Sequence, residues 1–189
     1  MGAFGTAHPM DAGGGTVGGR RTYGSLRAAS HDLATTLRHV GAARADRALV
    51  PPDMRERIML AVTQVNGCRW CSYMHTGMAL RAGVPPGEVR SLLGACVDGC
   101  PDGEVTALLY AQHWADTQGH ADPSARERLV EAYSPERAEA IERVVRTMNT
   151  ANLVGNTIDA VMSRLTRGGW ARAIRVDWRV RDPAFARPW

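Results

Sequence analysis

The sequence of 189 residues contains no lysine, so all 23 of its basic side chains are arginines. These arginines are spread along the whole chain among 19 acidic residues and leave a net charge of only +4. A protein that binds nucleic acid concentrates its basic charge on one face or one element, and no dense basic block is present. The composition therefore predicts no nucleic-acid partner.

A long hydrophobic run is also missing. The longest uninterrupted apolar stretch, residues 58–62, is far shorter than the ~20 residues that a membrane-spanning helix needs. No basic start followed by an apolar stretch and a small-residue cleavage site marks the chain for export. We therefore expect a cytoplasmic protein without a membrane partner.

Cysteine is scarce, since the chain has only Cys68, Cys71, Cys96 and Cys100. Four cysteines in a chain of this length are too few for a secreted disulfide scaffold. In a reducing compartment, a close pair is more often catalytic or metal-binding. The chemistry is therefore expected at the closest pair, Cys68 and Cys71.

Three segments differ in composition. Residues 1–24 hold 8 of the 20 glycines and little that a core could bury, so a flexible leader is expected there. Residues 25–167 carry apolar positions at helical spacing and are predicted to form one helical domain. Residues 168–189 are rich in tryptophan, and we expect this extended tail to pack either on its own core or on a neighbouring subunit.

The predicted fold is all-α, a bundle of six to seven helices, because no segment alternates convincingly between polar and apolar residues. The predicted helices cover residues 25–50, 54–64, 68–82, 86–97, 103–118, 124–133 and 135–167. Two capping boxes are predicted at helix starts: Asp53 with Glu56, and Ser124 with Glu127.

The last predicted helix has the most regular pattern. Its apolar stripe continues for about eight turns at helical period. The stripe consists of Ile141, Val144, Val145, Met148, Ala151, Ile158, Val161, Met162 and Leu165. Asn149, Asn152 and Asn156 follow one line beside it, and buried asparagines of this kind commonly fix the register between packed helices. We expect this line to specify an oligomer, with substrate contact as the alternative.

The most informative segment is Cys68-Arg-Trp-Cys71-Ser-Tyr-Met-His75, which opens a predicted helix after Asn66-Gly67. Residues three and four apart are neighbours on a helix, so Cys68, Cys71 and His75 share one face. The β-carbons of the two cysteines are then ~5–6 Å apart, which is close enough for a disulfide. Amide groups at the helix start and the nearby imidazole both favour a thiolate. The spacing therefore predicts a pair that cycles between dithiol and disulfide.

The two cysteines are expected to play different roles. Cys71 lies one turn from His75 and is the expected base-assisted nucleophile. Cys68 is expected to be the more exposed partner, which resolves the intermediate and meets the reductant. The reverse assignment stays open.

Other interpretations of these residues also stay open. Structural zinc would use Cys68 and Cys71 with either His75 or the pair Cys96 and Cys100. Cys96 and Cys100 are alternatively a second redox pair, or their spacing is incidental. Glu56 is either a helix cap or a carboxylate that orients His75 and raises its basicity.

The chain contains a glutamate that is followed, after eleven residues, by Cys-x-x-Cys-x-x-x-His. This pattern resembles that of the carboxymuconolactone decarboxylase superfamily, and within it that of the alkyl hydroperoxidase D-like branch. Glu56, Cys68, Cys71 and His75 match that pattern without gaps. The resemblance continues through residues 75–83 and 107–111 and covers roughly residues 30–165. It implies an all-helical fold and a homo-oligomer.

The resemblance further implies a thiol peroxidase or disulfide reductase with no bound metal or organic cofactor. The Cys71 thiolate attacks a peroxide oxygen, and Cys68 condenses with the resulting sulfenic acid. Glu56 and His75 form a proton relay, and a lipoyl-bearing adaptor or similar dithiol re-reduces the pair. Some members carry a histidine directly before the second cysteine, where this chain has Trp70. The decarboxylases of the superfamily, which generally lack the paired cysteines, imply the alternative of a non-redox enzyme.

Overall fold

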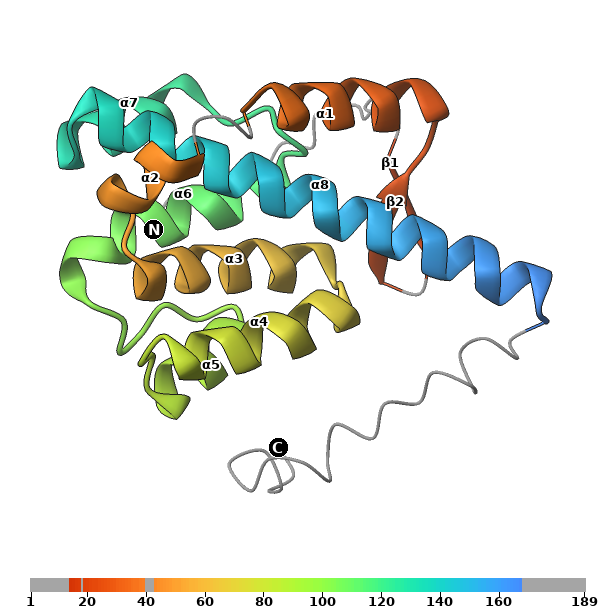
Figure 1. Ribbon diagram of the computed structural model, residues 1–189, viewed down its shortest axis with the longest axis horizontal. Coiled ribbons are helices and arrows are strands. Elements are labelled where there is room, and N and C mark those ends of the chain that lie inside the picture. The colour runs from red at the N-terminus through yellow and green to blue at the C-terminus, as the bar shows by residue number, and fades with distance from the viewer. Residues whose placement is uncertain (1–13, 18, 40–42, 168–189) are drawn as a thin grey trace, which may run out of the picture.

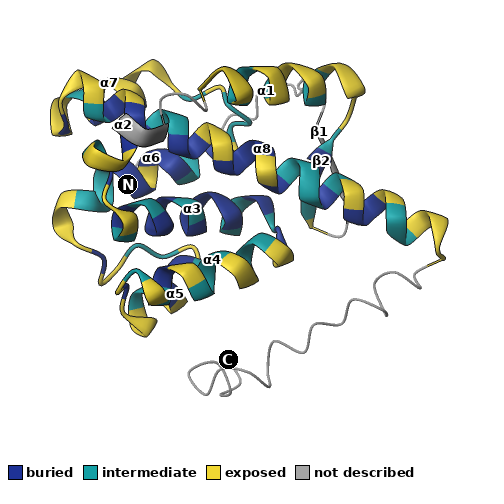
Figure 2. Ribbon diagram, viewed as in Figure 1, coloured by how far each residue is buried: buried dark blue, intermediate teal, exposed yellow. Residues whose placement is uncertain are grey.

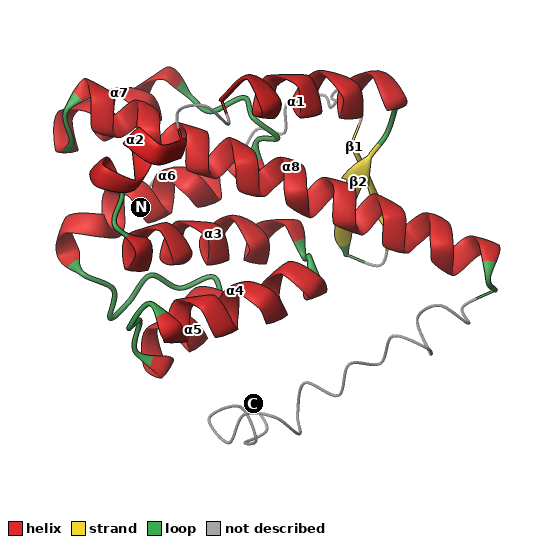
Figure 3. Ribbon diagram, in the orientation of Figure 1, coloured by secondary structure: helices red, strands yellow, loops and turns green. Residues whose placement is uncertain are grey.

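Helices make up nearly all of the regular structure in the computed structural model, which describes residues 14–17, 19–39 and 43–167 (Figure 3). The helices are α1 (Leu26–His39), α2 (Ala43–Leu49), α3 (Pro52–Asn66), α4 (Arg69–Arg81), α5 (Pro86–Leu93), α6 (Asp102–Asp116), α7 (Pro123–Ala132) and α8 (Pro135–Leu165). Two short strands, β1 (Gly14–Val17) and β2 (Arg20–Tyr23), pair as an antiparallel hairpin. The predicted all-α fold is confirmed. The described residues form eight helices rather than six to seven, because α1 and α2 replace the single helix expected over residues 25–50.

Proline determines where several helices begin. It occupies one of the first two positions of α3, α5, α7 and α8. At such a position the missing N–H needs no partner and the fixed φ suits a helix. The cap residues of α3 and α7 are consequently Pro51 and Asp122, and neither makes a side-chain capping hydrogen bond. The predicted capping boxes at residues 53–56 and 124–127 are therefore wrong.

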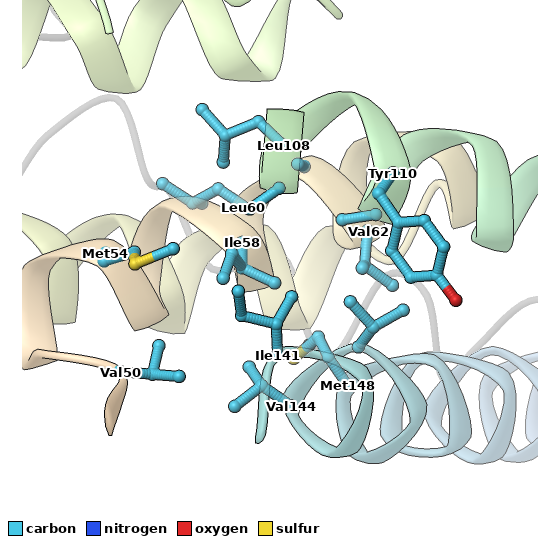
Figure 4. Close-up of a cluster of buried hydrophobic side chains, with 14 of the residues drawn as sticks. Val50, Met54, Ile58, Leu60, Val62, Leu108, Tyr110, Ile141, Val144 and Met148 are labelled. Carbon is cyan, nitrogen blue, oxygen red and sulfur yellow. The ribbon is translucent and has the colours of Figure 1, made fainter. Parts of the chain in front are cut away.

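Helix α3 lies at the centre of the bundle, against α4, α5, α6 and α8 (Figure 1). Figure 4 shows how apolar side chains of α3, α6 and α8 meet between these helices. Ile58, Leu108 and Ile141 are fully buried there. Each such side chain stabilises the fold by about 1.5–3 kcal/mol relative to an exposed one.

A buried arginine joins α3 to two further helices. The Arg57 guanidinium donates to Glu88 at 2.7 Å, to Asp53 at 2.9 Å and to both carboxylate oxygens of Glu104 at 3.2 Å. Arg57 is nearly fully buried, and its carboxylate partners raise its pKa even though burial alone lowers it. Asp53 therefore takes part in an ion cluster between α3, α5 and α6 and does not cap a helix.

Both halves of α8 contain buried positions (Figure 2), but the side chains buried in each half differ in kind. Its first half buries the predicted apolar residues Ile141, Val144, Val145 and Met148. Its second half buries Asn149, Asn152, Asn156 and Asp159, while Ile158, Val161 and Leu165 are exposed. The prediction that the apolar stripe faces the core is therefore wrong beyond Met148. This half of α8 instead packs on polar groups of α3, α4 and the hairpin.

The apolar positions of α1 are also exposed. Leu26, Leu33 and Leu37 face solvent, and α1 contains no buried residue. Helical spacing alone therefore does not identify the side of this helix that packs on α8.

The hairpin corrects the expectation of a flexible leader over residues 1–24. Strand β2 packs on α8, where the Tyr23 N–H donates to Thr157 Oγ1 at 3.0 Å and Asn156 Nδ2 donates to the Arg21 carbonyl at 2.9 Å. The Arg21 guanidinium also donates to Asp116 at 2.6 Å. These contacts offset the conformational entropy that this glycine-rich segment loses when it is ordered. The rest of the leader, residues 1–13, and the tail, residues 168–189, lie outside the described residues.

Within the described part of the chain, no helix combines the length and the apolar character that crossing a membrane requires.

Candidate redox site

The turn between α3 and α4 places the two cysteines. Gly67 follows the last residue of α3 with φ of 65° and donates its N–H to the carbonyls of Thr63 and Gln64. A β-carbon at Gly67 would lie 3.1 Å from the Gly19 carbonyl oxygen in the hairpin turn. Glycine is therefore required both by the positive φ and by the close approach of the hairpin. The chain leaves this turn at Cys68, which is the N-cap residue of α4.

Cys68 and Cys71 form a disulfide across the first turn of α4, with their Cα atoms 5.3 Å apart. The close approach that the spacing predicted is thus present. The Cys71 N–H also points at Cys68 Sγ, 3.4 Å away. Cys68 Sγ consequently occupies the position at which a helix start stabilises negative charge.

The exposure of the two cysteines is the opposite of what we expected. Cys68 is fully buried, whereas Cys71 is partly exposed. Helix α8 covers Cys68, since a β-carbon at Gly155 would lie 3.6 Å from its Sγ. The expectation that Cys68 is the more exposed partner is therefore wrong, because an element distant in the sequence packs on it.

His75 and Glu56 form a close pair beside the disulfide. His75 Nδ1 lies 2.7 Å from Glu56 Oε2, and the two side chains are only 13% and 7% exposed. With Nδ1–H donating to the carboxylate, a neutral imidazole keeps Nε2 as its proton acceptor. Glu56 is therefore the partner of His75 and not a helix cap. His75 itself lies one turn beyond Cys71 on α4.

A buried network of amide side chains joins α8 to the end of α3, next to the turn that carries the cysteines. Asn66 Nδ2 donates to Asn149 Oδ1 at 2.9 Å and to Asn152 Oδ1 at 3.3 Å. Asn152 Nδ2 donates to Thr63 Oγ1 at 3.2 Å, and Asn156 Nδ2 donates to the Asn66 carbonyl at 2.9 Å. The asparagine line on α8 therefore fixes the register between α3 and α8 of one chain, and the expected role in specifying an oligomer is wrong for these contacts.

Three charged side chains, from β2, α4 and α8, come together beside the same turn. Asp159 of α8 is buried and forms ion pairs with Arg20 of β2 and, at 3.9 Å, with Arg69 of α4. Burial and the nearby Arg69 charge lower the pKa of Arg20. No local sequence signal points to this cluster, because its members come from three elements far apart in the chain.

The remaining cysteines take no part in this site. Cys96 and Cys100 are free thiols and are not joined as a second redox pair. Burial, followed by the charge of Glu88, raises the pKa of the Cys100 thiol to about 11. Among the described residues, no group of three or more His, Cys, Asp or Glu side chains is arranged to hold a metal ion.

Trp70 separates the two cysteines along the chain and is 37% exposed. Tyr73, Met74 and Met78 of α4 are exposed as well. The partly exposed Cys71 thus belongs to a helix whose outer surface is apolar and aromatic.

Comparison with known proteins agrees with the motif. A family model described as the carboxymuconolactone decarboxylase family matches residues 32–117, which run from within α1 to just beyond α6 and include all four site residues. The match confirms the resemblance, although it ends before α7 and α8 and so covers less than residues 30–165. No curated protein and no solved structure matches the chain. The family includes both peroxidases and decarboxylases, so the match leaves the reaction to be inferred from the site.

Proposed function

We propose that this protein, whose residues 32–117 match the carboxymuconolactone decarboxylase family, is a thiol-dependent peroxidase and disulfide oxidoreductase in antioxidant defence. The observation that carries the proposal is the Cys68–Cys71 disulfide at the start of α4, one turn before a histidine that is paired with a buried glutamate. A dithiol, a base and a group that orients the base are the parts that nucleophilic thiol chemistry requires.

Cys71 is the nucleophile in this proposal, because its sulfur is the accessible one. His75 takes the Cys71 proton, and the thiolate attacks one oxygen of a hydroperoxide. The O–O bond breaks, Cys71 becomes a sulfenic acid, and the proton from His75 leaves with the alcohol. The Cys68 thiol then attacks the Cys71 sulfur, so that the disulfide forms and water is released.

The buried position of Cys68 changes its expected contact with the reductant. An incoming thiolate reaches Cys71, so the mixed disulfide forms there and Cys68 is the leaving group. The second thiol of the donor then releases Cys71. A dithiol donor, such as a lipoyl group on a protein, fits this sequence of steps. Since the pair must be re-reduced after each turnover, we place the protein in the reducing cytoplasm.

Trp70 stands where some relatives of the peroxidase branch have a histidine. The proposed relay therefore consists of Glu56 and His75 alone. The apolar surface that Trp70 shares with Met74 and Met78 favours an organic hydroperoxide over hydrogen peroxide as the substrate.

We also propose that the protein is a homo-oligomer. Ile158, Val161 and Leu165 form an exposed apolar stripe on the part of α8 that projects beyond α3 and α4 (Figure 1). A contiguous exposed patch of this kind commonly marks an interface.

A decarboxylase-type enzyme is the second candidate, favoured by the name of the matching family. In that case His75 and Glu56 carry out acid–base chemistry on a lactone, and the cysteines are dispensable. Activity on a γ-carboxymuconolactone that survives replacement of both Cys68 and Cys71 by serine would establish this function.

Counting thiols tests the redox proposal. The fully reduced protein should lose two of its four thiols on reaction with one equivalent of cumene hydroperoxide, when the thiols are counted after denaturation. Cys71→Ser should abolish this reaction, whereas Cys68→Ser should stop at a sulfenic acid that a dimedone reagent captures. Cys96→Ser is the matched control and should still lose two thiols. Equal residual activity in Cys68→Ser and Cys71→Ser would contradict the assigned roles.

A further inference from the structure

The residues on both sides of Cys68 are held by two other elements. Asn156 of α8 binds the Asn66 carbonyl, and Gly155 lies over the Cys68 sulfur. On the other side, the hairpin turn lies against Gly67, where a β-carbon would be 3.4 Å from Cγ of Arg20. The redox turn, residues 66–68, is thus enclosed by α8 and the hairpin.

This enclosure brings an excess of positive charge to the turn. Arg69 directly follows Cys68, and the stem of Arg20 packs on the residue that precedes it. Both guanidinium groups share a single carboxylate, that of Asp159. One unit of positive charge therefore remains unbalanced within this cluster. The side chain of Asp159 is only 6% exposed, so it anchors the arginines from the protein side.

From this arrangement we infer that Arg20 and Arg69, anchored by Asp159, are positioning residues that stabilise Cys68 as the thiolate leaving group when the disulfide is reduced. The inference rests on the proposed redox function and adds a role for residues outside the motif.

The step is a thiol–disulfide exchange. A donor thiolate forms a bond to the Cys71 sulfur, the Cys71–Cys68 bond breaks, and its electron pair stays on Cys68. The Cys71 N–H already faces Cys68 Sγ at 3.4 Å. Arg69, the next residue along the chain, and Arg20, whose stem packs on Gly67, add positive charge beside this turn. A leaving thiolate that is stabilised in this way departs faster, and the reduced form becomes more favourable.

The test measures the equilibrium between the dithiol and the disulfide in glutathione redox buffers at pH 7. Arg69→Gln is the main variant, because Arg69 is 70% exposed and its replacement leaves the core intact. We expect this variant to shift the equilibrium constant toward the disulfide by about three- to tenfold, because the leaving thiolate loses one neighbouring positive charge. Arg20→Gln should shift it in the same direction.

Two controls separate charge from structure. Arg69→Lys keeps the charge and should stay within about twofold of the wild-type constant. Arg81→Gln removes the same charge from the exposed far end of α4, about 18 Å along the helix axis, and should leave the constant unchanged because about 8 Å is the screening length at physiological ionic strength. The rate of disulfide cleavage by dithiothreitol should fall in the same two glutamine variants.

The outcomes distinguish the inference from the proposed function. If the wild-type pair does not exchange with glutathione at all, the redox function itself is wrong. If the wild type exchanges but Arg69→Gln has the same constant, the inference alone is overturned. It is also overturned if Arg69→Lys behaves like Arg69→Gln, or if Arg81→Gln shifts the constant as much.

Discussion

At the scale of single residues, the pair of His75 and Glu56 is the clearest feature of the site. The carboxylate holds one ring nitrogen at 2.7 Å, which orients the imidazole and favours the tautomer that leaves Nε2 as the proton acceptor. Replacing Glu56 by glutamine keeps the shape but removes the charge. We expect the rate of thiol loss with cumene hydroperoxide to fall about tenfold or more in Glu56→Gln, within the range that general base catalysis contributes.

Glu127→Gln provides the control for that measurement, since Glu127 is exposed on α7. It should react at the wild-type rate. A Glu56→Gln protein that folds normally and reacts as fast as the control would show that the glutamate has no part in the proton relay.

The residues of the motif could be identified from the sequence because their spacing is local. Cys68, Cys71 and His75 are three and four residues apart, from the N-cap of α4 to its second turn, and helix geometry alone brings such residues together. The burial of Cys68 could not be predicted in this way, since it depends on Gly155 and the hairpin. The same holds for Asp159, whose partners are contributed by β2 and α4.

At the scale of the elements, proline was a stronger signal than the capping pattern. Proline at the start of α3 moves Glu56 into the interior of the helix, where it faces α4 instead of the helix end. The period of 3.6 correctly predicted the existence of α8, but it did not predict which side of the second half is buried. That side is polar, and its partners are the amide groups of α3 and the charges of the hairpin.

The amide network between α3 and α8 leads to a prediction about stability. Asn152 is fully buried, accepts from Asn66 and donates to Thr63. Asn152→Ala removes one hydrogen-bond partner from each of these two groups. We expect the free energy of unfolding in urea to fall by about 1–3 kcal/mol, the cost of leaving buried polar groups unpaired.

Thr147→Ala is the matched change on the exposed side of α8 and should alter the free energy of unfolding by less than about 0.5 kcal/mol. If Asn152→Ala is no less stable than Thr147→Ala, the network does not contribute to the stability of the α3–α8 packing.

At the scale of the whole molecule, the fold class followed from the absence of alternating segments, but the arrangement of the hairpin did not. Strands of four residues are too short to produce a recognisable pattern, and β2 is held by side chains of α8 and α6. The hairpin therefore joins the end of the bundle at which the redox turn lies (Figure 1).

The projecting end of α8 is expected to mediate self-association of the protein. Ile158, Val161 and Leu165 are 53%, 47% and 73% exposed, while the opposite side of the same turns buries Asn156 and Asp159. Apolar side chains on an exposed helix end gain free energy when a second copy covers them. We therefore expect sedimentation equilibrium to give a mass that is a multiple of 20.4 kDa, and the double variant Ile158→Lys/Leu165→Lys to reduce it toward one chain.

Thr147→Lys adds a lysine to an exposed position nearer the middle of α8 and should leave the assembly intact. A wild-type mass of one chain would refute the homo-oligomer. An unchanged mass in the double variant would place the interface elsewhere, because two buried lysine charges in an apolar contact cost more than such a contact contributes. Since the double variant leaves Cys68, Cys71 and the covering Gly155 unchanged, loss of assembly should leave the count of two peroxide-reactive thiols per chain unchanged.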